Sequence, residues 1–226
     1  MDRAIVWDSV KKSYASPHRI TIFSDASIEV LKGEFVGIFG PSGVGKTTMI
    51  LLTAGILNPD RGKIYVLGRD ITEMSRDELA LFRRKHIGIV FQFFNLIPML
   101  TVLENVLLPL ELNGFSRNEA IRRAKEILSY VGLLRKADMM PSRLSGGEQQ
   151  RIAIARAVVH NPQIVLADEP TGNLDEENKE SIFELFRDLN KEGITIIVAT
   201  HDVELARRYV HRGYHIRGHK FNPVGV

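Results

Sequence analysis

The sequence predicts an α/β protein with a largely parallel central sheet, an antiparallel β flank and an inserted helical part. Three observations support this prediction. Short apolar runs alternate with helical patterns along most of the chain, which is the arrangement of a parallel sheet. The first 33 residues instead alternate apolar and polar positions, and strand patterns disappear between about residues 94 and 160.

The strand patterns fall into three groups. Near the N-terminus, Ala4–Val10 and Arg19–Leu31 alternate as strands with one buried face do, which predicts the antiparallel flank. Near the end, residues 214–224 predict a small hairpin. Four runs with continuous apolar character indicate strands buried on both faces of the central sheet; they cover residues 34–39, 86–91, 164–168 and 194–200.

Capping boxes mark the starts of the predicted helices. In an S-x-x-E box the serine and the glutamate each satisfy a free backbone amide at the helix start. One such helix carries apolar residues at helical spacing and is expected to end at Gly132. The three serine–glutamate pairs are Ser75 with Glu78, Ser116 with Glu119, and Ser145 with Glu148.

The chain is predicted to form one domain over residues 1–226, because no linker or repeat divides it. We assign its nucleotide-binding core to about residues 1–92 and 160–226 and its helical subdomain to about residues 93–159. With 226 residues and 44% hydrophobic content, the chain can bury a sizeable core without a partner.

Composition excludes several classes of function. There is no cysteine, so disulfides, thiolate metal sites and cysteine nucleophiles are excluded. The 30 basic and 27 acidic residues leave a formal net charge of only +3, which gives no reason to expect a nucleic-acid partner. No export signal is visible, and no apolar run approaches the ~18 residues that cross a bilayer. We therefore expect a chain that is soluble by itself.

A phosphate-binding loop follows the first central strand. The stretch GPSGVGKTT, Gly40 to Thr48, fits G-x-x-x-x-G-K-[ST] and lies between a strand pattern and a helical pattern. Its backbone amides would surround phosphate oxygens, with Lys46 reaching the β- and γ-phosphates and the Thr47 hydroxyl on Mg²⁺. A chance glycine-rich turn is the alternative, and the flanking strand and helix argue against it. We therefore predict a P-loop NTPase with a RecA-like core, with these nucleotide-binding residues: Gly40, Ser42, Gly43, Gly45, Lys46, Thr47 and Thr48.

Two neighbouring acids end a later strand. In the stretch IVLADEPTGNLD, the apolar run ends in Asp168 and Glu169. Asp168 is placed to bind Mg²⁺ as the acid of a Walker B strand does, and Glu169 to accept a proton from an attacking water. Adjacent like charges would raise one pKa unless a cation lies between them, which also indicates Mg²⁺. The alternative is a structural role in a turn or helix cap, which the phosphate loop in the same chain disfavours.

The stretch LSGGEQQRIAIARA, Leu144 to Ala157, resembles the signature sequence of ATP-binding-cassette (ABC) ATPases. It precedes the Walker B strand as the signature does in that family, and the resemblance covers essentially the whole chain. It implies that Ser145, Gly146 and Gly147 face the γ-phosphate bound to a second subunit, so that a homodimer completes each site. A serine cap followed by glycines also exposes helix amides to an anion. A purely structural cap is compatible with the same residues.

The resemblance assigns roles to two further polar residues. Gln92, after the strand GIVF, corresponds to the Q-loop glutamine, which senses Mg²⁺ and water. His201, after ITIIVAT, corresponds to the switch histidine, which contacts the γ-phosphate and orients Glu169. Either residue alone at a strand end would indicate only a structural role.

The resemblance also extends to the D-loop and to the adenine-stacking position. Asp175 matches the D-loop acid, which packs across the dimer. Tyr14 lies 26 residues before Gly40, where the family commonly places an aromatic against adenine. Trp7 and Phe23 are nearby aromatics with an ordinary core interpretation.

The stretch ADEPTGNLD together with residues 90–110 resembles the lipoprotein-releasing and macrolide-exporting branch of the family. That branch implies an ATPase at the cytoplasmic face of the cell membrane, driving a separate integral membrane permease for export or extraction of a substrate such as a lipoprotein or drug. The apolar segment Phe93–Leu112 lies where the family receives the coupling helix of that permease. An ordinary subdomain core is the alternative for any single residue there.

Other members of the superfamily remain alternatives. An importer ATPase would share all the chemistry. A non-transport ATPase acting on chromosomes or ribosomes is disfavoured, because the chain has no sustained heptad tract and only one cassette. Neither the substrate nor the direction of transport follows from these residues.

The C-terminal segment YVHRGYHIRGHKF departs from the branch pattern. His211, His215 and His219 have i, i+4 spacing, which on a helix would suit a metal. Gly213 and Gly218 argue against a helix, so a solvated hairpin is the favoured interpretation.

Overall fold

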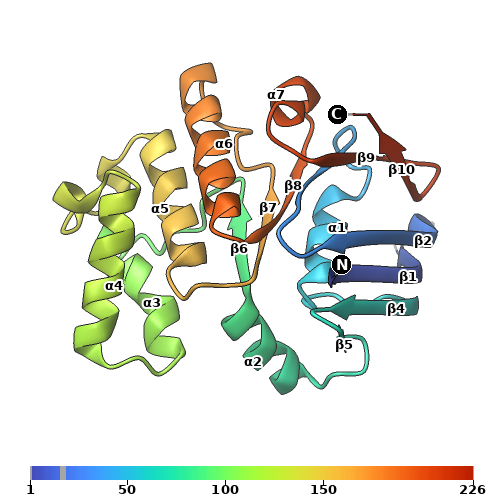
Figure 1. The fold of residues 1–226 in the computed structure, drawn as a ribbon, viewed down its shortest axis with the longest axis horizontal. Coiled ribbons are helices and arrows are strands. Elements are labelled where there is room, and N and C mark those ends of the chain that lie inside the picture. The colour runs from blue at the N-terminus through green and yellow to red at the C-terminus, as the bar shows by residue number, and fades with distance from the viewer. Residues whose placement is uncertain (1, 16–18, 226) are drawn as a thin grey trace.

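The computed structural model describes residues 2–15 and 19–225, which form two sheets with helices packed around them (Figure 1). The larger sheet has the strand order β10-β9-β3-β8-β7-β6, and all neighbours except β9 and β10 are parallel. The four predicted central strands are confirmed as its adjacent members β3, β8, β7 and β6. The strands are β3 (Phe35–Phe39), β6 (Ile87–Phe91), β7 (Ile164–Asp168), β8 (Thr195–Thr200), β9 (Arg212–Arg217) and β10 (Lys220–Val224).

The smaller sheet is antiparallel, with the strand order β2-β1-β4-β5. The predicted flank is confirmed in its first two strands, whereas β4 and β5 were not predicted. The two unpredicted strands are short, and β5, at the edge of the sheet, has only two residues. The bounds are β1 (Arg3–Ala15), β2 (Arg19–Leu31), β4 (Arg61–Val66) and β5 (Arg69–Asp70).

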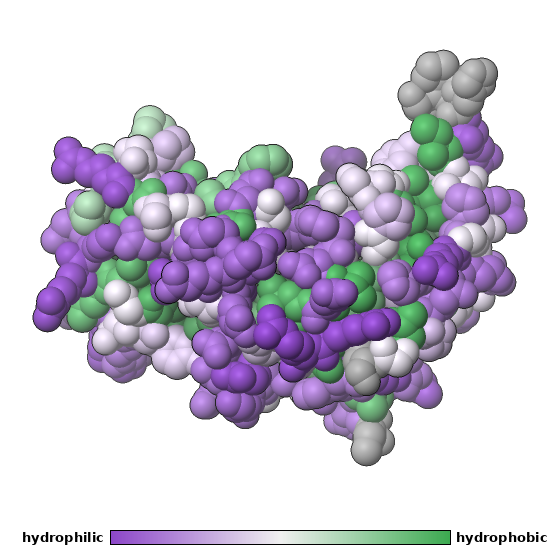
Figure 2. Space-filling model, turned by 90° about the horizontal axis from the view of Figure 1, so that it is seen from above, coloured by the Kyte–Doolittle hydropathy of each residue, from purple (hydrophilic) through white to green (hydrophobic). Residues whose placement is uncertain are grey.

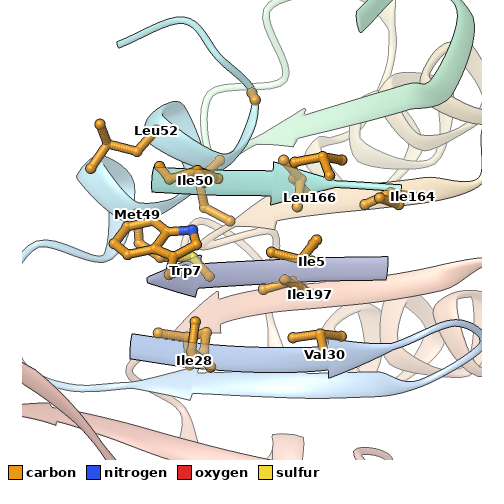
Figure 3. Close-up of a cluster of buried hydrophobic side chains, with 14 of the residues drawn as sticks. Ile5, Trp7, Ile28, Val30, Met49, Ile50, Leu52, Ile164, Leu166 and Ile197 are labelled. Carbon is orange, nitrogen blue, oxygen red and sulfur yellow. The ribbon is translucent and has the colours of Figure 1, made fainter. Parts of the chain in front are cut away.

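Helix α1 (Lys46–Thr53) is packed between the two sheets. Buried side chains from both sheets and from α1 form one cluster, which includes Trp7, Met49 and Leu166 (Figure 3). The Trp7 indole N–H donates to the Thr53 hydroxyl at 3.1 Å inside this cluster. The helix that follows the phosphate loop is therefore fixed by apolar packing and by a buried hydrogen bond.

The opposite face of the parallel sheet carries a second apolar cluster. Along β7, Ile164 and Leu166 belong to the first cluster while Val165 and Ala167 belong to the second, as the alternation of side chains in a strand requires. Three helices, α5 (Gly146–Val158), α6 (Glu176–Lys191) and α7 (Val203–Arg207), contribute to this second cluster. Seen from above, the surface is mostly hydrophilic with a few separate hydrophobic patches (Figure 2).

A third apolar cluster belongs to the helical part. Its fully buried members all lie between residues 102 and 159, which supports the subdomain boundary of about 93–159 that we propose. They come mainly from α3 (Val102–Leu112), α4 (Arg117–Tyr130) and α5, with short 3₁₀ turns at Leu134–Lys136 and Pro141–Arg143. None of the helices in the described ranges is both long and apolar enough to span a bilayer.

The helix starts correct one prediction. The boxes at Ser75 before α2 (Arg76–His86) and at Ser145 before α5 are confirmed, and an unpredicted box at Thr101 starts α3. Ser116 makes only half of its predicted box: it accepts from the Glu119 amide, but the Glu119 carboxylate pairs with Arg122 and Arg123 instead. The competing guanidinium groups explain the difference, because they offer the Glu119 carboxylate several hydrogen bonds from ionised donors, whereas the backbone amide offers one from a neutral donor.

The C-terminal hairpin is confirmed as β9 and β10, and β9 also extends the parallel sheet beside β3. The three histidines contact different parts of the chain. His211 Nδ1 accepts from the Phe35 amide at 3.2 Å, His215 packs on the Phe39 ring, and His219 Nδ1 lies 3.2 Å from the Ile22 carbonyl. These contacts favour the hairpin interpretation over a shared metal.

Candidate nucleotide-binding and hydrolysis site

The phosphate loop connects the buried strand β3 to the N-terminus of α1. Gly43 and Gly45 have φ angles of 79° and 115°, which side chains other than glycine adopt only with strain. A Cβ atom at Gly45 would also lie 2.4 Å from the Ile22 side chain. Gly45 caps α1 without a side-chain hydrogen bond, so the first amides of the helix remain free to bind an anion.

The Lys46 ammonium lies at the centre of this loop. It donates to the carbonyls of Gly40 and Pro41 at 2.6 and 3.0 Å and lies 3.1 Å from Glu169 Oε1. The side chain is almost fully buried, so its charge acts with little screening by water. A cation is thereby fixed beside both the loop and the end of β7.

Asp168 and Thr47 bring a carboxylate and a hydroxyl side by side. Asp168 is buried, and its Oδ1 atom has no hydrogen-bond partner among the described residues. Burial raises the pKa of the Asp168 carboxyl, an effect opposed by a hydrogen bond from the Thr47 hydroxyl. A buried carboxylate oxygen without a partner, next to a hydroxyl, matches the oxygen ligands that Mg²⁺ prefers. The residues therefore fit the predicted ion.

Glu169 is held in a different environment, although it is the next residue. Its φ angle of 47° lies in the left-handed region, and its amide donates to the Ala199 carbonyl at 2.8 Å. This turn directs the carboxylate between Lys46, on Oε1, and His201, whose Nδ1 lies 2.8 Å from Oε2. The Glu169 side chain is 14% exposed and that of His201 is 63% exposed. Glu169 can therefore accept a proton at the mouth of the site while its position is fixed by its neighbours.

Gln92 follows β6, the strand beside β7, which ends in Asp168. Its side-chain amide is 3.5 Å from Asn173 Oδ1, and the Asn173 amide donates to the Gln92 carbonyl at 3.3 Å. Among the described residues Gln92 makes no hydrogen bond to Thr47 or Asp168, so its role as an Mg²⁺ ligand stays a prediction. Asn173 was missed by the sequence analysis, although it lies in the stretch GNLD from which only Asp175 was selected.

Tyr14 lies beside the N-terminal turn of the helix that follows the phosphate loop. Its hydroxyl lies 3.3 Å from Thr48 Oγ1, and the residue is 38% exposed. Trp7 and Phe23 are fully buried and pack edge to face at 5.2 Å. Only Tyr14 of these three presents a ring that a nucleobase could reach.

The signature residues lie at the N-terminus of α5, away from this array. Ser145 caps the helix, and Gly147 packs so closely on α6 that an added Cβ would lie 2.1 Å from Asn178 Oδ1. Asn178 in turn donates to Asp175, which caps α6. In the part of the chain that the structure describes, no hydrogen bond or ion pair joins residues 145–148 to residues 40–48. One chain therefore holds the phosphate loop and the signature apart.

Comparison with known proteins identifies the family. The model of the ABC transporter family matches residues 23–172. The chain is also 44% identical over 201 residues to the lipoprotein-releasing system ATP-binding protein LolD of Bacteroides fragilis, covering 88% of this chain and 92% of that protein. This chain belongs to the ABC transporter family. The resemblance identified from the signature and Walker stretches is thereby confirmed.

Other ABC proteins are similar over the same region. The macrolide export ATP-binding/permease protein MacB of Rhodopirellula baltica is 46% identical over 201 residues, which are 87% of this chain and 29% of that longer protein. Among solved structures, the dimeric post-hydrolysis state of the ATP-binding cassette MJ0796 bound to ADP and Pi superposes with a TM-score of 0.89. It is 40% identical in sequence, with 96% of each chain covered. The predicted α/β P-loop fold is confirmed by this match.

Proposed function

We propose that this chain is the ATP-binding and ATP-hydrolysing subunit of an ABC transporter. The observation that carries the proposal is the array of Lys46, Glu169 and His201 beside the Thr47–Asp168 oxygen pair. Phosphoryl transfer to water requires a cation that binds the phosphates, a carboxylate that binds the metal ion and an oriented base. The family membership and the ADP-bound and Pi-bound relative support the same reaction.

Each residue of the array has one task in this reaction. The loop amides and Lys46 bind the β- and γ-phosphates of ATP. Thr47 and Asp168 would hold Mg²⁺, which neutralises charge on the phosphates when bound. Glu169 accepts the proton of the attacking water, and His201 keeps the Glu169 carboxylate in position through the 2.8 Å contact.

The functional unit is a homodimer with ATP held between the phosphate loop of one copy and the signature of the other. This arrangement accounts for the separation of residues 145–148 from residues 40–48 within one chain. The helix amides that follow Ser145 are suited to an anion. A dimer is also the state of the MJ0796 relative.

The partner is an integral membrane permease that binds the side of the chain formed by Phe93–Leu112. Three apolar side chains there are exposed: Phe93 by 73%, Met99 by 80% and Leu112 by 55%. Exposed apolar side chains on one segment are typical of an interaction surface. Docking there would place the chain at the cytoplasmic face of the cell membrane, and the relatives named for lipoprotein release and macrolide export favour export or extraction.

The substitution Glu169→Gln tests the reaction. It removes the base and keeps the side-chain volume, so kcat for ATP hydrolysis should fall by at least about 100-fold while ATP binding is retained. The measurement is phosphate release by the full-length protein, with nucleotide binding and dimer formation followed in parallel. Glu176→Gln, at an 86% exposed glutamate on α6, is the matched control. Wild-type turnover in Glu169→Gln would refute the assignment of the base.

A further inference from the structure

The capping boxes of this chain differ in what the hydroxyl of the cap does. In such a box the cap hydroxyl accepts a hydrogen bond from the amide of a glutamate three residues on, and the glutamate carboxylate accepts one from the cap amide. The third complete box among the described residues starts the signature helix α5, so its cap can be compared with two others in the same chain. The complete boxes are Ser75 with Glu78, Thr101 with Glu104, and Ser145 with Glu148.

The first two boxes also use the proton of the cap hydroxyl. Ser75 Oγ donates to Glu78 Oε2 at 2.7 Å. Thr101 Oγ1 donates to Glu104 Oε2 at 2.8 Å. A hydroxyl has a single proton to donate, so in both boxes this proton is already bound within the helix start.

The hydroxyl of Ser145 is bound differently. It accepts from the Glu148 amide at 3.3 Å, but in the part of the chain that the structure describes it donates to no acceptor. The Glu148 carboxylate also lies farther from the cap, because its Oε2 accepts from the cap amide at 3.1 Å, against 2.8 and 2.7 Å in the other two boxes. Ser145 is exposed, so its proton is available to an acceptor outside this chain.

A lysine accounts for the position of the Glu148 carboxylate. Lys136 donates to Glu148 Oε1, the oxygen that the cap does not use. This hydrogen bond lowers the pKa of Glu148, and burial acts in the opposite direction. Among the described residues neither Glu78 nor Glu104 has a cationic partner. Because a hydrogen bond from an ammonium group is stronger than one from a neutral hydroxyl, Lys136 holds the carboxylate away from the Ser145 hydroxyl.

The serine–glutamate pair at Ser116 shows the same competition with more cations. Arg122 and Arg123 both donate to Glu119. Within the described ranges the Glu119 carboxylate accepts from neither the amide nor the hydroxyl of Ser116. The four helix starts thus form a series. Without a cation the hydroxyl donates to the glutamate, with one lysine only the amide does, and with two arginines neither does.

The position of Lys136 is fixed by packing on both sides of it. Lys136 ends the 3₁₀ turn that follows α4, and its amide donates to the Leu133 carbonyl at 2.9 Å. Leu133 and Ala137 are buried in the apolar cluster of the helical part. The Lys136 side chain is 38% exposed and that of Glu148 is 18% exposed. The pair therefore lies beside the signature near the surface, on a backbone that the core holds in place.

We propose that Lys136 is a positioning residue for the nucleotide of the second copy: it holds the Glu148 carboxylate so that the Ser145 hydroxyl stays free to donate to a phosphate oxygen of ATP. The proposal rests on the proposed function and deepens it. A hydroxyl that donates to a carboxylate must break a charge-assisted hydrogen bond before it can donate to a phosphate. Lys136 removes this competition before ATP arrives, so the donor is preorganised.

The substitution Lys136→Met tests the proposal in the full-length chain. It keeps the aliphatic stem and removes the cation, so the Glu148 carboxylate should accept from the Ser145 hydroxyl as in the boxes without a cation. We expect kcat/KM for ATP hydrolysis to fall by about tenfold. The ATP concentration for half-maximal dimerisation, measured in the Glu169→Gln background, should rise by a similar factor. The melting temperature should stay near that of wild type, since a surface ion pair contributes little to stability.

Two single variants serve as controls. Lys136→Arg keeps a cation beside Glu148 and should stay within about threefold of wild type in both measurements. Lys191→Met removes an ion pair of 2.8 Å with Asp188 at the end of α6, and it should leave both measurements unchanged.

Two double variants test the route through Ser145. Glu148→Ala removes the competing acceptor, so adding Lys136→Met to it should cause no further loss of hydrolysis. Ser145→Ala removes the hydroxyl itself, so Lys136→Met should again cause no further loss in that background.

Three results would overturn the proposal. In the first, Lys136→Met keeps the kcat/KM of wild type. In the second, it costs as much in the Ser145→Ala background as in wild type, because the lysine would then act through its charge alone. In the third, the loss of activity follows a fall in melting temperature, because the role would then be structural. Absence of ATP hydrolysis by the wild-type chain would instead refute the proposed function on which the proposal rests.

Discussion

The phosphate-loop side and the signature side of this molecule are built differently. On the first side, residues from three distant segments meet, and Glu169 contacts both Lys46 and His201 directly. On the second side, Ser145 caps its own helix, Gly146 lies beside Phe94 and Leu174, and Gly147 lies against Asn178 of α6. The first side brings its polar groups together within one chain, whereas among the described residues the second offers a helix cap without a cationic side chain hydrogen-bonded to Ser145.

The difference indicates where the second copy of the chain contributes. A helix N-terminus with small residues can approach a phosphate closely, provided another molecule brings the phosphate to it. The phosphate-loop side is thus held together by contacts within one chain, whereas the signature side depends for its function on association with a second copy. Substitutions on the two sides should separate these dependences.

The largest effect is expected for Lys46→Met, on the phosphate-loop side. The variant keeps the aliphatic stem and removes the charge that faces both the phosphates and Glu169, so kcat/KM for ATP should fall by at least about 1,000-fold. Phosphate release and nucleotide binding by the full-length chain are the measurements. Lys32→Met, at a lysine on the surface turn before β3, serves as control and should remain within twofold. An active Lys46→Met protein would contradict the role of this array.

A pair of glycine substitutions tests the signature side. At Gly146 an added Cβ meets no atom closer than 3.5 Å, so Gly146→Ala should keep its melting temperature. Its methyl group would nevertheless lie at the surface that we propose to face the nucleotide of the second copy, and hydrolysis should fall by about 30-fold. At Gly147 the added Cβ would lie 2.1 Å from Asn178, so Gly147→Ala should destabilise the monomer itself by about 1–3 kcal/mol.

Three measurements distinguish the two glycines: the melting temperature, the rate of ATP hydrolysis and nucleotide-driven dimerisation. Dimerisation is measured in the Glu169→Gln background. If Gly146→Ala remained fully active and dimerised normally, the signature side would have no role across the dimer.

A pH dependence is expected at the far end of the signature helix α5. His160 follows α5, and burial lowers its pKa from 6.5 to about 4. The unfolded chain therefore takes up a proton between pH 6.5 and pH 4 that the folded chain does not. The resulting stability is complete above pH 6.5 and is lost as the pH falls towards 4, by about 3 kcal/mol. In urea unfolding, His160→Asn should lose less stability over this interval than wild type, and His219→Asn should behave as wild type.

The smallest effect is expected at Tyr14, at the outer edge of the phosphate-loop side. Loss of the ring in Tyr14→Ala should weaken ATP binding by about fivefold, the value of one aromatic contact. Tyr14→Phe keeps the ring and loses only the contact with Thr48, so it should bind ATP within twofold of wild type. Titration of both variants with a fluorescent ATP analogue makes the comparison, and equal affinities for Ala and Phe would exclude stacking.

Several parts of the site could be predicted from the sequence, because they depend on local backbone geometry. The loop Gly40–Thr48 needs glycines where φ is positive, and a serine cap three residues before a glutamate starts a helix by itself. The acids Asp168 and Glu169 follow an apolar run, which places them at the edge of a sheet. Such signals are contained within a few neighbouring residues.

Other parts could not be predicted, because nothing local encodes them. The addition of β9 to the parallel sheet, the hydrogen bond from Trp7 to Thr53 and the support of Phe94 by Arg156 each join distant segments. The half-formed box at Ser116 was mispredicted because Arg122 and Arg123 compete for Glu119. These outcomes depend on which side chains the packing brings within reach.

The sequence by itself determined the four central strands, the first two strands of the flank, most helix starts, the phosphate loop and the pair of acids, since periodicity and backbone preference act over a few residues. The tertiary structure alone decided that Glu169 lies between Lys46 and His201, and that Ser145 lies away from all of them. The physical reason is the strand order, which brings the carboxyl ends of β3, β7 and β8 to one edge and holds the signature helix in a separate layer.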